Sequence, residues 1–189
     1  MKTVYYTATT LDGFLADEQD NLDWLLKQPQ DPDDSEFSYE RFIAGVGALV
    51  MGSTTYRWVV DHHEWPYTLP TWVLSSRPQP AVPGADLRFA AGSVAELHPA
   101  WLEAANGRNV WVVGGGDLAG QFADAGLLDE IMVSIAPVTL GAGRPLLPRR
   151  YDLELLTTGR NAGFLCARYR VAGPLPASGA TNRATASKT

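Results

Sequence analysis

The chain has 189 residues, of which 46% are hydrophobic and 19% are charged, a composition typical of one globular domain with a sizeable core. Its formal net charge of -6 argues against a nucleic-acid groove or an anionic membrane surface as the partner. The N-terminus shows no signal-peptide pattern, and no apolar run approaches the roughly 18 residues of a membrane helix. We therefore expect a cytoplasmic protein that binds a small molecule.

Strand and helix patterns alternate along the chain. Runs rich in β-branched and aromatic residues predict strands, and capping residues followed by apolar residues predict helices. In chain order, strands are expected at residues 4–9, 48–51, 71–75, 109–113 and 130–135, and helices after Ser35, after Ser53 or Thr54, at residues 93–104 and at residues 117–125. Residues 152–157 and 165–171 predict an antiparallel pair that closes the fold.

This alternation predicts an α/β fold with a central, mostly parallel sheet and helices on both faces. The closing pair would add an antiparallel edge to that sheet. Residues 1–172 are expected to form one domain. Residues 173–189 are rich in Pro, Ala, Ser, Thr and Gly and lack an apolar period, so we expect a disordered tail there.

The strongest local signal is a strand that runs into Gly114, Gly115 and Gly116 and then into a helix. Glycine lets the backbone approach a ligand closely, and the first amides of a helix attract anions. The segment therefore predicts a phosphate site, although a tight turn without a ligand would use the same residues. Ala119 stands where the G-x-G-x-x-G fingerprint needs its third glycine, which disfavours a standard Rossmann dehydrogenase.

Two further strand ends carry residues that suit phosphate. A glycine and hydroxyl residues occupy positions 52–54, and two serines and an arginine occupy positions 75–77. A guanidinium matches the geometry of a ribose 2'-phosphate, whereas an ordinary helix cap and a surface arginine are the alternative interpretations. Because the carboxyl ends of parallel strands share one edge of a sheet, the three strand ends together predict one nucleotide site.

The histidines and the cysteine do not form a recognisable site. His62, His63 and Glu64 are adjacent, so their side chains point in different directions, and no second cluster in the sequence pairs with them. We predict no metal site. Cys166 lies in an apolar run and is expected to be an inert thiol in the core.

Five segments resemble, in their order and spacing, the RibD C-terminal domain, a branch of the dihydrofolate-reductase-like superfamily. They are residues 9–16, 50–56, 74–77, 113–118 and 128–146. The resemblance covers about residues 2–171 and implies a three-layer fold with a central mixed sheet and NADPH across its C-terminal edge. Family members are commonly homodimers, in which the region matching residues 137–145 often takes part.

The resemblance also implies where NADPH would bind. The pyrophosphate would lie near residues 52–54, the adenosine ribose and 2'-phosphate near residues 75–77, and the nicotinamide near the loop at residues 11–16. The expected cofactor-binding residues are Ala8, Leu15, Gly52, Ser53, Thr54, Ser75, Ser76, Arg77, Val113, Gly114, Gly115, Gly116, Asp117 and Leu118.

The activity implied by the resemblance is NADPH-dependent reduction of a pterin-like or pyrimidine-like heterocycle, or of a carbonyl or imine. The folate enzyme carries an acidic residue on its first helix that helps protonate the pterin, and Glu36 falls at the matching place. A glutamate in a first turn also complements the helix dipole, and Asp23 is a second candidate catalytic residue. The expected walls of the substrate pocket are Trp24, Phe37, Tyr39 and Phe42.

Three other functions stay open. The ribosylaminopyrimidine reductase of riboflavin synthesis is disfavoured for two reasons. That enzyme is usually fused to a zinc deaminase, which this sequence does not show, and its phosphorylated substrate needs basic residues, whereas the residues before Glu40 are mostly acidic. A non-catalytic module that keeps the nucleotide fold is a second alternative. Folate reduction is the third, with Arg41 and Arg57 as the nearby basic residues.

Overall fold

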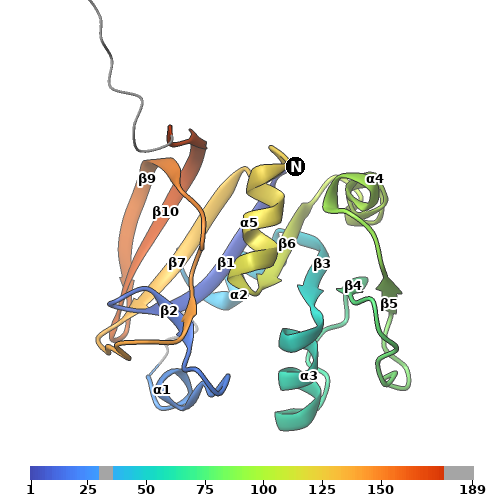
Figure 1. Ribbon diagram of the computed structural model, residues 1–189, viewed down its shortest axis with the longest axis horizontal. Helices are drawn as coiled ribbons and strands as arrows, with labels where there is room; N and C mark the ends of the chain where they lie inside the picture. The colour runs from blue at the N-terminus through green and yellow to red at the C-terminus, as the bar shows by residue number, and fades with distance from the viewer. Residues whose placement is uncertain (30–35, 177–189) are drawn as a thin grey trace, which may run out of the picture.

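The computed structural model describes residues 1–29 and 36–176 (Figure 1). The helices are α1 (Asp23–Leu26), α2 (Tyr39–Ala44), α3 (Ser53–His62), α4 (Val94–Ala105) and α5 (Gly116–Asp124). The strands are β1 (Thr3–Thr10), β2 (Phe14–Ala16), β3 (Val46–Gly52), β4 (Thr71–Leu74), β5 (Leu87–Ala90), β6 (Asn109–Gly114), β7 (Glu130–Ala136), β8 (Arg144–Pro145), β9 (Tyr151–Asn161) and β10 (Phe164–Pro174).

In the described part of the chain, eight strands form one sheet in the order β5-β4-β3-β6-β1-β7-β10-β9. The strands from β5 to β7 in this order are parallel. The β9–β10 hairpin adds an antiparallel edge next to β7, at the opposite side of the molecule from β4 and β5 in Figure 1. This arrangement confirms the α/β fold with a mostly parallel sheet and an antiparallel C-terminal hairpin.

Helices cover both faces of the sheet because the central strands present apolar side chains on both. Tyr5 of β1 packs in the cluster that contains Trp101 of α4 and Phe122 of α5. Its neighbour Tyr6 points to the other face, where it stacks on Phe42 of α2 with ring centroids 4.1 Å apart. Figure 1 shows α5 in front of the sheet and α2 behind it. The molecule therefore has the expected three layers.

The helix ends follow the predicted capping only in part. Ser93 caps α4 in a capping box with Glu96, as its sequence predicts. Neither Ser53 nor Thr54 caps α3, because Gly52 is already the N-cap and both residues lie within the helix. Ser35 falls outside the described residues, and the helix after it is capped by Ser38.

The tail was expected to begin at residue 173, but β10 continues beyond that point. Gly173 and Pro174 pair with Asp152 and Tyr151 of β9, so the partner strand orders two residues that lack an apolar pattern. Residues 177–189 lie outside the described residues. None of the helices in the described ranges has the length and hydrophobicity needed to span a bilayer.

Candidate functional site

A cleft of about 890 Å³ lies at the carboxyl ends of the parallel strands, within the range of about 300–1,000 Å³ that small-molecule sites occupy. The ends of β1, β3, β4 and β6 contribute to its walls, together with the first turns of α3 and α5. All the predicted cofactor-binding residues except Arg77 line it. The fold thus brings the three phosphate-suited strand ends into one cleft.

The three consecutive glycines have different structural roles. A Cβ at Gly116 would lie 2.2 Å from the carbonyl oxygen of Pro145, so this glycine is needed for close packing of two backbone segments. A Cβ at Gly115 would meet no heavy atom within 4 Å, and the residue faces the cleft. The peptide bond between Gly114 and Gly115 is cis. Packing therefore explains Gly116, whereas Gly115 leaves room for a ligand to approach the backbone.

The helices α3 and α5 both begin at the cleft without a side-chain cap. Their N-cap residues are Gly52 and Gly115, and neither helix end shows a side-chain hydrogen bond to its free amides. Ser53 and Thr54 of α3 and Gly116 of α5 line the cleft. Uncapped amides at a helix N-terminus favour a bound anion, so two such ends suit the two phosphates of a pyrophosphate.

The end of β4 forms a compact turn. The hydroxyl of Ser75 accepts a hydrogen bond from the amide of Arg77 at 3.1 Å and donates one to the carbonyl oxygen of Arg77 at 2.7 Å. Ser75 and Ser76 line the cleft, whereas Arg77 is exposed beside it. The guanidinium of Arg77 has no ion pair within residues 1–29 and 36–176, so its charge is available to a ligand.

The carboxylate of Asp117 stands in the first turn of α5 and lines the cleft. It accepts hydrogen bonds from Gln121 and from Arg149, each at 3.0 Å. The bond from Gln121 and then the bond from Arg149 lower the pKa of Asp117. This carboxylate is therefore ionised near neutral pH and already has a cationic partner.

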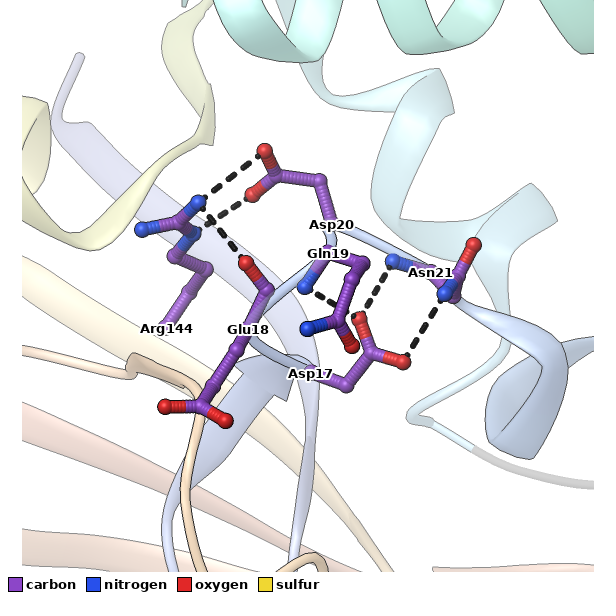
Figure 2. A network of polar contacts seen from close by, with 6 residues as sticks. All are labelled: Asp17, Glu18, Gln19, Asp20, Asn21 and Arg144. Atoms are coloured by element: carbon purple, nitrogen blue, oxygen red, sulfur yellow. Dashed lines mark hydrogen bonds and ion pairs between the residues drawn. The ribbon is translucent and has the colours of Figure 1, made fainter.

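An ion pair that the sequence did not reveal lines the cleft near β2 and β8. The guanidinium of Arg144 donates to the two carboxylate oxygens of Asp20, from Nε at 2.6 Å and from Nη2 at 3.2 Å (Figure 2). Both residues belong to the lining. The hydrogen bond to Asp20 raises the pKa of Arg144. The two residues are far apart in the chain, so no local pattern joins them.

The two predicted catalytic carboxylates lie away from the cleft lining. Glu36 is exposed in a turn that precedes α2, because that helix begins only at Tyr39. Asp23 is the first residue of α1 and is exposed. Neither side chain is among the residues that line the cleft, so the structure does not place either one at the site where a substrate would bind.

The predicted aromatic walls also lie elsewhere. Trp24 and Phe37 are buried in a core cluster with Met132 of β7 and Phe164 of β10. Tyr39 packs edge-on against Trp111, with ring centroids 6.0 Å apart, and Phe42 stacks on Tyr6 of β1. These rings support the far face of the sheet, because that face needs apolar cover, and none of them lines the cleft.

The apolar wall of the cleft is instead formed by Leu22, Leu25 and Trp58. Leu22 and Leu25 are three residues apart at α1 and so share one face, while Trp24 between them turns to the core. Trp58 stands four residues after Thr54 on α3. Plotting the residues of α1 and α3 around a helix axis would have shown which side chains face the cleft and which face the core.

The turn between β1 and β2, beside this wall, is fixed by Asp12. Its carboxylate accepts hydrogen bonds from the hydroxyl of Thr10 at 2.5 Å and from the amides of Leu140 and Gly141 at 3.0 and 2.7 Å. The bond from Thr10 and then those from the two amides lower the pKa of Asp12. The turn that leads to Leu15 is thus tied to the loop after β7.

Comparison with known proteins places the chain in a family. The uncharacterized protein YwjB of Bacillus subtilis (strain 168) is 31% identical over 146 residues, which is 77% of this chain and 82% of that protein. A solved structure from Shewanella sp. PV-4, assigned by name to riboflavin biosynthesis, has a TM-score of 0.76 and 26% identity and covers 90% of this chain and 99% of its own.

The fold extends to a more distant enzyme. Dihydrofolate reductase from Enterococcus faecalis has a TM-score of 0.55 at 13% identity, with 90% of this chain and 96% of that chain covered. Residues 2–159 match the RibD C-terminal domain, which supports a reductase-type function. The chain belongs to the RibD C-terminal domain family.

Proposed function

We propose that the protein is an NADPH-dependent reductase that transfers hydride to a small heterocycle, carbonyl or imine. The observation that carries this proposal is that three phosphate-suited strand ends meet in one cleft. Family membership supports a reductase, and the Enterococcus faecalis dihydrofolate reductase that shares the fold is a complex with NADP(H).

The residues of the cleft fit a dinucleotide phosphate. The uncapped amides of α3 and α5 would hold the pyrophosphate, and Ser75, Ser76 and Arg77 would hold the adenosine ribose and its 2'-phosphate. Gly115 leaves the space that a close backbone contact needs. Ala8 and Leu15 would lie beside the nicotinamide. NADPH, when bound, supplies the hydride.

The chain's own part in the reaction would be to hold the acceptor against the cofactor and to exclude some of the surrounding water. Leu22, Leu25 and Trp58 supply the apolar surface for a planar substrate. Within the described residues, the carboxylates in the lining are Asp20 and Asp117, and both are paired with arginines. We therefore assign delivery of the proton to water in the cleft.

A second candidate function is the ribosylaminopyrimidine reductase of riboflavin synthesis, because the Shewanella protein is named for that pathway. Expression in a strain that requires riboflavin separates the two candidates. Growth without riboflavin would favour the second candidate, and lack of growth by a well-expressed, folded protein would favour the first.

A thermal-shift titration with NADPH, NADH and no nucleotide tests cofactor binding directly. A ligand that binds only the folded state stabilises it by about 2.7 kcal/mol at 100 times its Kd. We expect NADPH to raise the melting temperature more than NADH. No shift with either nucleotide would refute the reductase. A shift without NADPH oxidation across a panel of heterocycles, aldehydes and imines would favour a non-catalytic nucleotide-binding module.

We also propose that the protein forms a homodimer, as the family resemblance implies. The β9–β10 hairpin at the edge of the sheet exposes four leucines, of which Leu155 and Leu165 are 55% and 56% exposed. Exposed leucines on an edge hairpin favour contact with another protein surface.

A further inference from the structure

Arg144 lines the cleft and forms an ion pair with Asp20 there. It is the one basic side chain in the lining of the described structure. Its Nε and Nη2 donate to the carboxylate of Asp20, and Nη2 also donates to the carbonyl oxygen of Glu18 at 3.2 Å (Figure 2). A guanidinium has five N–H groups in a fixed fork. The carboxylate thus occupies the bidentate edge. Nη1 has no hydrogen-bond partner among residues 1–29 and 36–176, so its two N–H groups remain for a ligand.

The turn that carries Asp20 is built to hold this carboxylate in place. Asp17 accepts hydrogen bonds from the amide of Gln19 at 2.8 Å and from the amide and side chain of Asn21, both at 2.9 Å (Figure 2). Asp20 itself has a positive φ of 65°, a conformation that Asp tolerates better than most residues. The position of Asp20 is therefore set by the turn and not by Arg144 alone.

The other half of the ion pair is fixed by the backbone. Gly143, directly before Arg144, has a φ of 151°, and a Cβ there would lie 2.1 Å from the carbonyl oxygen of Ala16. Only glycine permits this close contact between β2 and β8. Arg144 and Asp20 are thus held on two segments whose separation is determined by packing, and the pair is preorganised before a ligand enters.

The paired charges in the cleft lining affect which charge a ligand can carry. The ionic side chains in the described lining are Asp20, Asp117 and Arg144, and Asp117 has its own partner in Arg149. The cleft therefore has no unpaired cation on the side of Arg144. A phosphate or carboxylate on the substrate that accepts from the Nη1 donors would lie near the Asp20 carboxylate, whose charge already offsets that of Arg144. A neutral carbonyl or ring nitrogen needs only the free Nη1 donors.

We propose that the Asp20–Arg144 pair makes the cleft selective for a neutral substrate with a hydrogen-bond acceptor and against its phosphorylated or carboxylated analogues. This inference rests on the proposed function, because it treats the cleft as the substrate site of a reductase. Arg144 contacts the acceptor through Nη1, and Asp20 acts through Arg144 as the residue that keeps anions out.

Two fluorescent probes of matched shape test this selectivity: pterin, which is neutral at pH 7, and pterin-6-carboxylate. Their dissociation constants are measured with the full-length protein, with and without saturating NADP⁺. We expect the unmodified protein to bind pterin more tightly. In Asp20→Asn, the ratio of the two constants shifts toward the carboxylate by about tenfold, the effect of one charge-assisted contact. The double variant Asp20→Asn with Arg144→Gln loses that shift.

The control variant is Asp124→Asn, which removes the same charge and also breaks an arginine ion pair, with Arg149, but lies outside the cleft lining. It is expected to leave the probe ratio unchanged. Arg144→Gln alone removes the Nη1 donors and is expected to weaken the binding of pterin, which provides a second test if Asp20→Asn does not fold.

Three results would overturn the proposal: a preference of the unmodified protein for the carboxylate, the same ratio in Asp20→Asn, or no binding of either probe to any variant. Titration of the same proteins with NADPH keeps the two proposals separate. Failure to bind NADPH refutes the reductase, whereas normal NADPH binding with an unchanged probe ratio refutes only the selectivity of the ion pair.

Discussion

Replacing Gly116 with alanine is expected to destabilise the protein, because α5 begins against the backbone of β8 and the residue after it. The new Cβ would lie 2.2 Å from the carbonyl oxygen of Pro145 and 2.6 Å from that of Leu146. Ordinary carbon–oxygen contacts are about 3.3–3.6 Å, so the backbone must shift by about 1 Å. Overpacking of this kind costs about 1–3 kcal/mol, which lowers the melting temperature by roughly 2–12 °C for a domain of this size.

The matched control is Gly115→Ala, since a Cβ at this position meets no heavy atom within 4 Å and faces the cleft. We expect Gly115→Ala to be as stable as the unmodified protein but to bind NADPH more weakly. We expect Gly116→Ala to unfold at a lower urea concentration. Urea denaturation followed by circular dichroism measures stability, and calorimetric titration measures NADPH affinity. A Gly116→Ala protein as stable as the unmodified one would refute the packing role. Unchanged NADPH affinity in Gly115→Ala would refute close approach of the cofactor.

Three further substitutions test the cofactor, the core and the assembly. Arg77→Gln should lower the affinity for NADPH about tenfold and leave the affinity for NADH unchanged, because one charge-assisted contact with the 2'-phosphate is lost. Equal losses of affinity for both nucleotides, measured by calorimetry, would contradict that contact. Burial raises the pKa of Glu130, but hydrogen bonds from Lys2 and Arg168 outweigh it and lower the pKa below its ordinary 4.5. The stability that ionised Glu130 contributes is therefore complete above pH 4.5 and is lost as the pH falls through the pKa of the folded state. Glu130→Gln should lower the free energy of unfolding by about 1–3 kcal/mol at pH 7 and flatten the acid side of a plot of stability against pH. An unchanged slope in that plot would exclude this role of Glu130. Leu155→Glu should convert the proposed dimer to a monomer in sedimentation velocity, and a monomeric unmodified protein would refute the dimer.

The parallel core of the sheet was predictable because its strands are rich in β-branched and aromatic residues, which suit burial on both faces. The strand β5 was not predicted, since Leu87 to Ala90 is short and half-exposed at the sheet edge. Its order comes from pairing with β4 and from Arg88, whose guanidinium lies 4.5 Å from the ring centroid of Trp72. Such contacts join distant residues and leave no periodic signal.

The two sides of the cleft differed in how far they could be predicted. The phosphate-suited residues follow directly after strands, and the edge of a parallel sheet brings such positions together whatever the side chains elsewhere do. The substrate wall depends on which side of a short helix faces the sheet. Trp24 was expected in the wall of the substrate pocket, but it is buried in the core, whereas Leu22 and Leu25 line the cleft.

This difference has a consequence for specificity within the family. The proposed phosphate contacts come mainly from backbone amides and glycines, so they do not depend on the identity of the side chains elsewhere in the cleft. The substrate side consists of side chains from α1, α3 and the ion pair Asp20–Arg144, each of which can be replaced without disturbing the sheet. A relative that kept the glycines but lost Asp20 would have a free guanidinium in the same cleft, and by our argument it would accept an anionic substrate. Family membership therefore supports a reductase-type function, and under our proposal the residue opposite Arg144 determines the charge of the substrate.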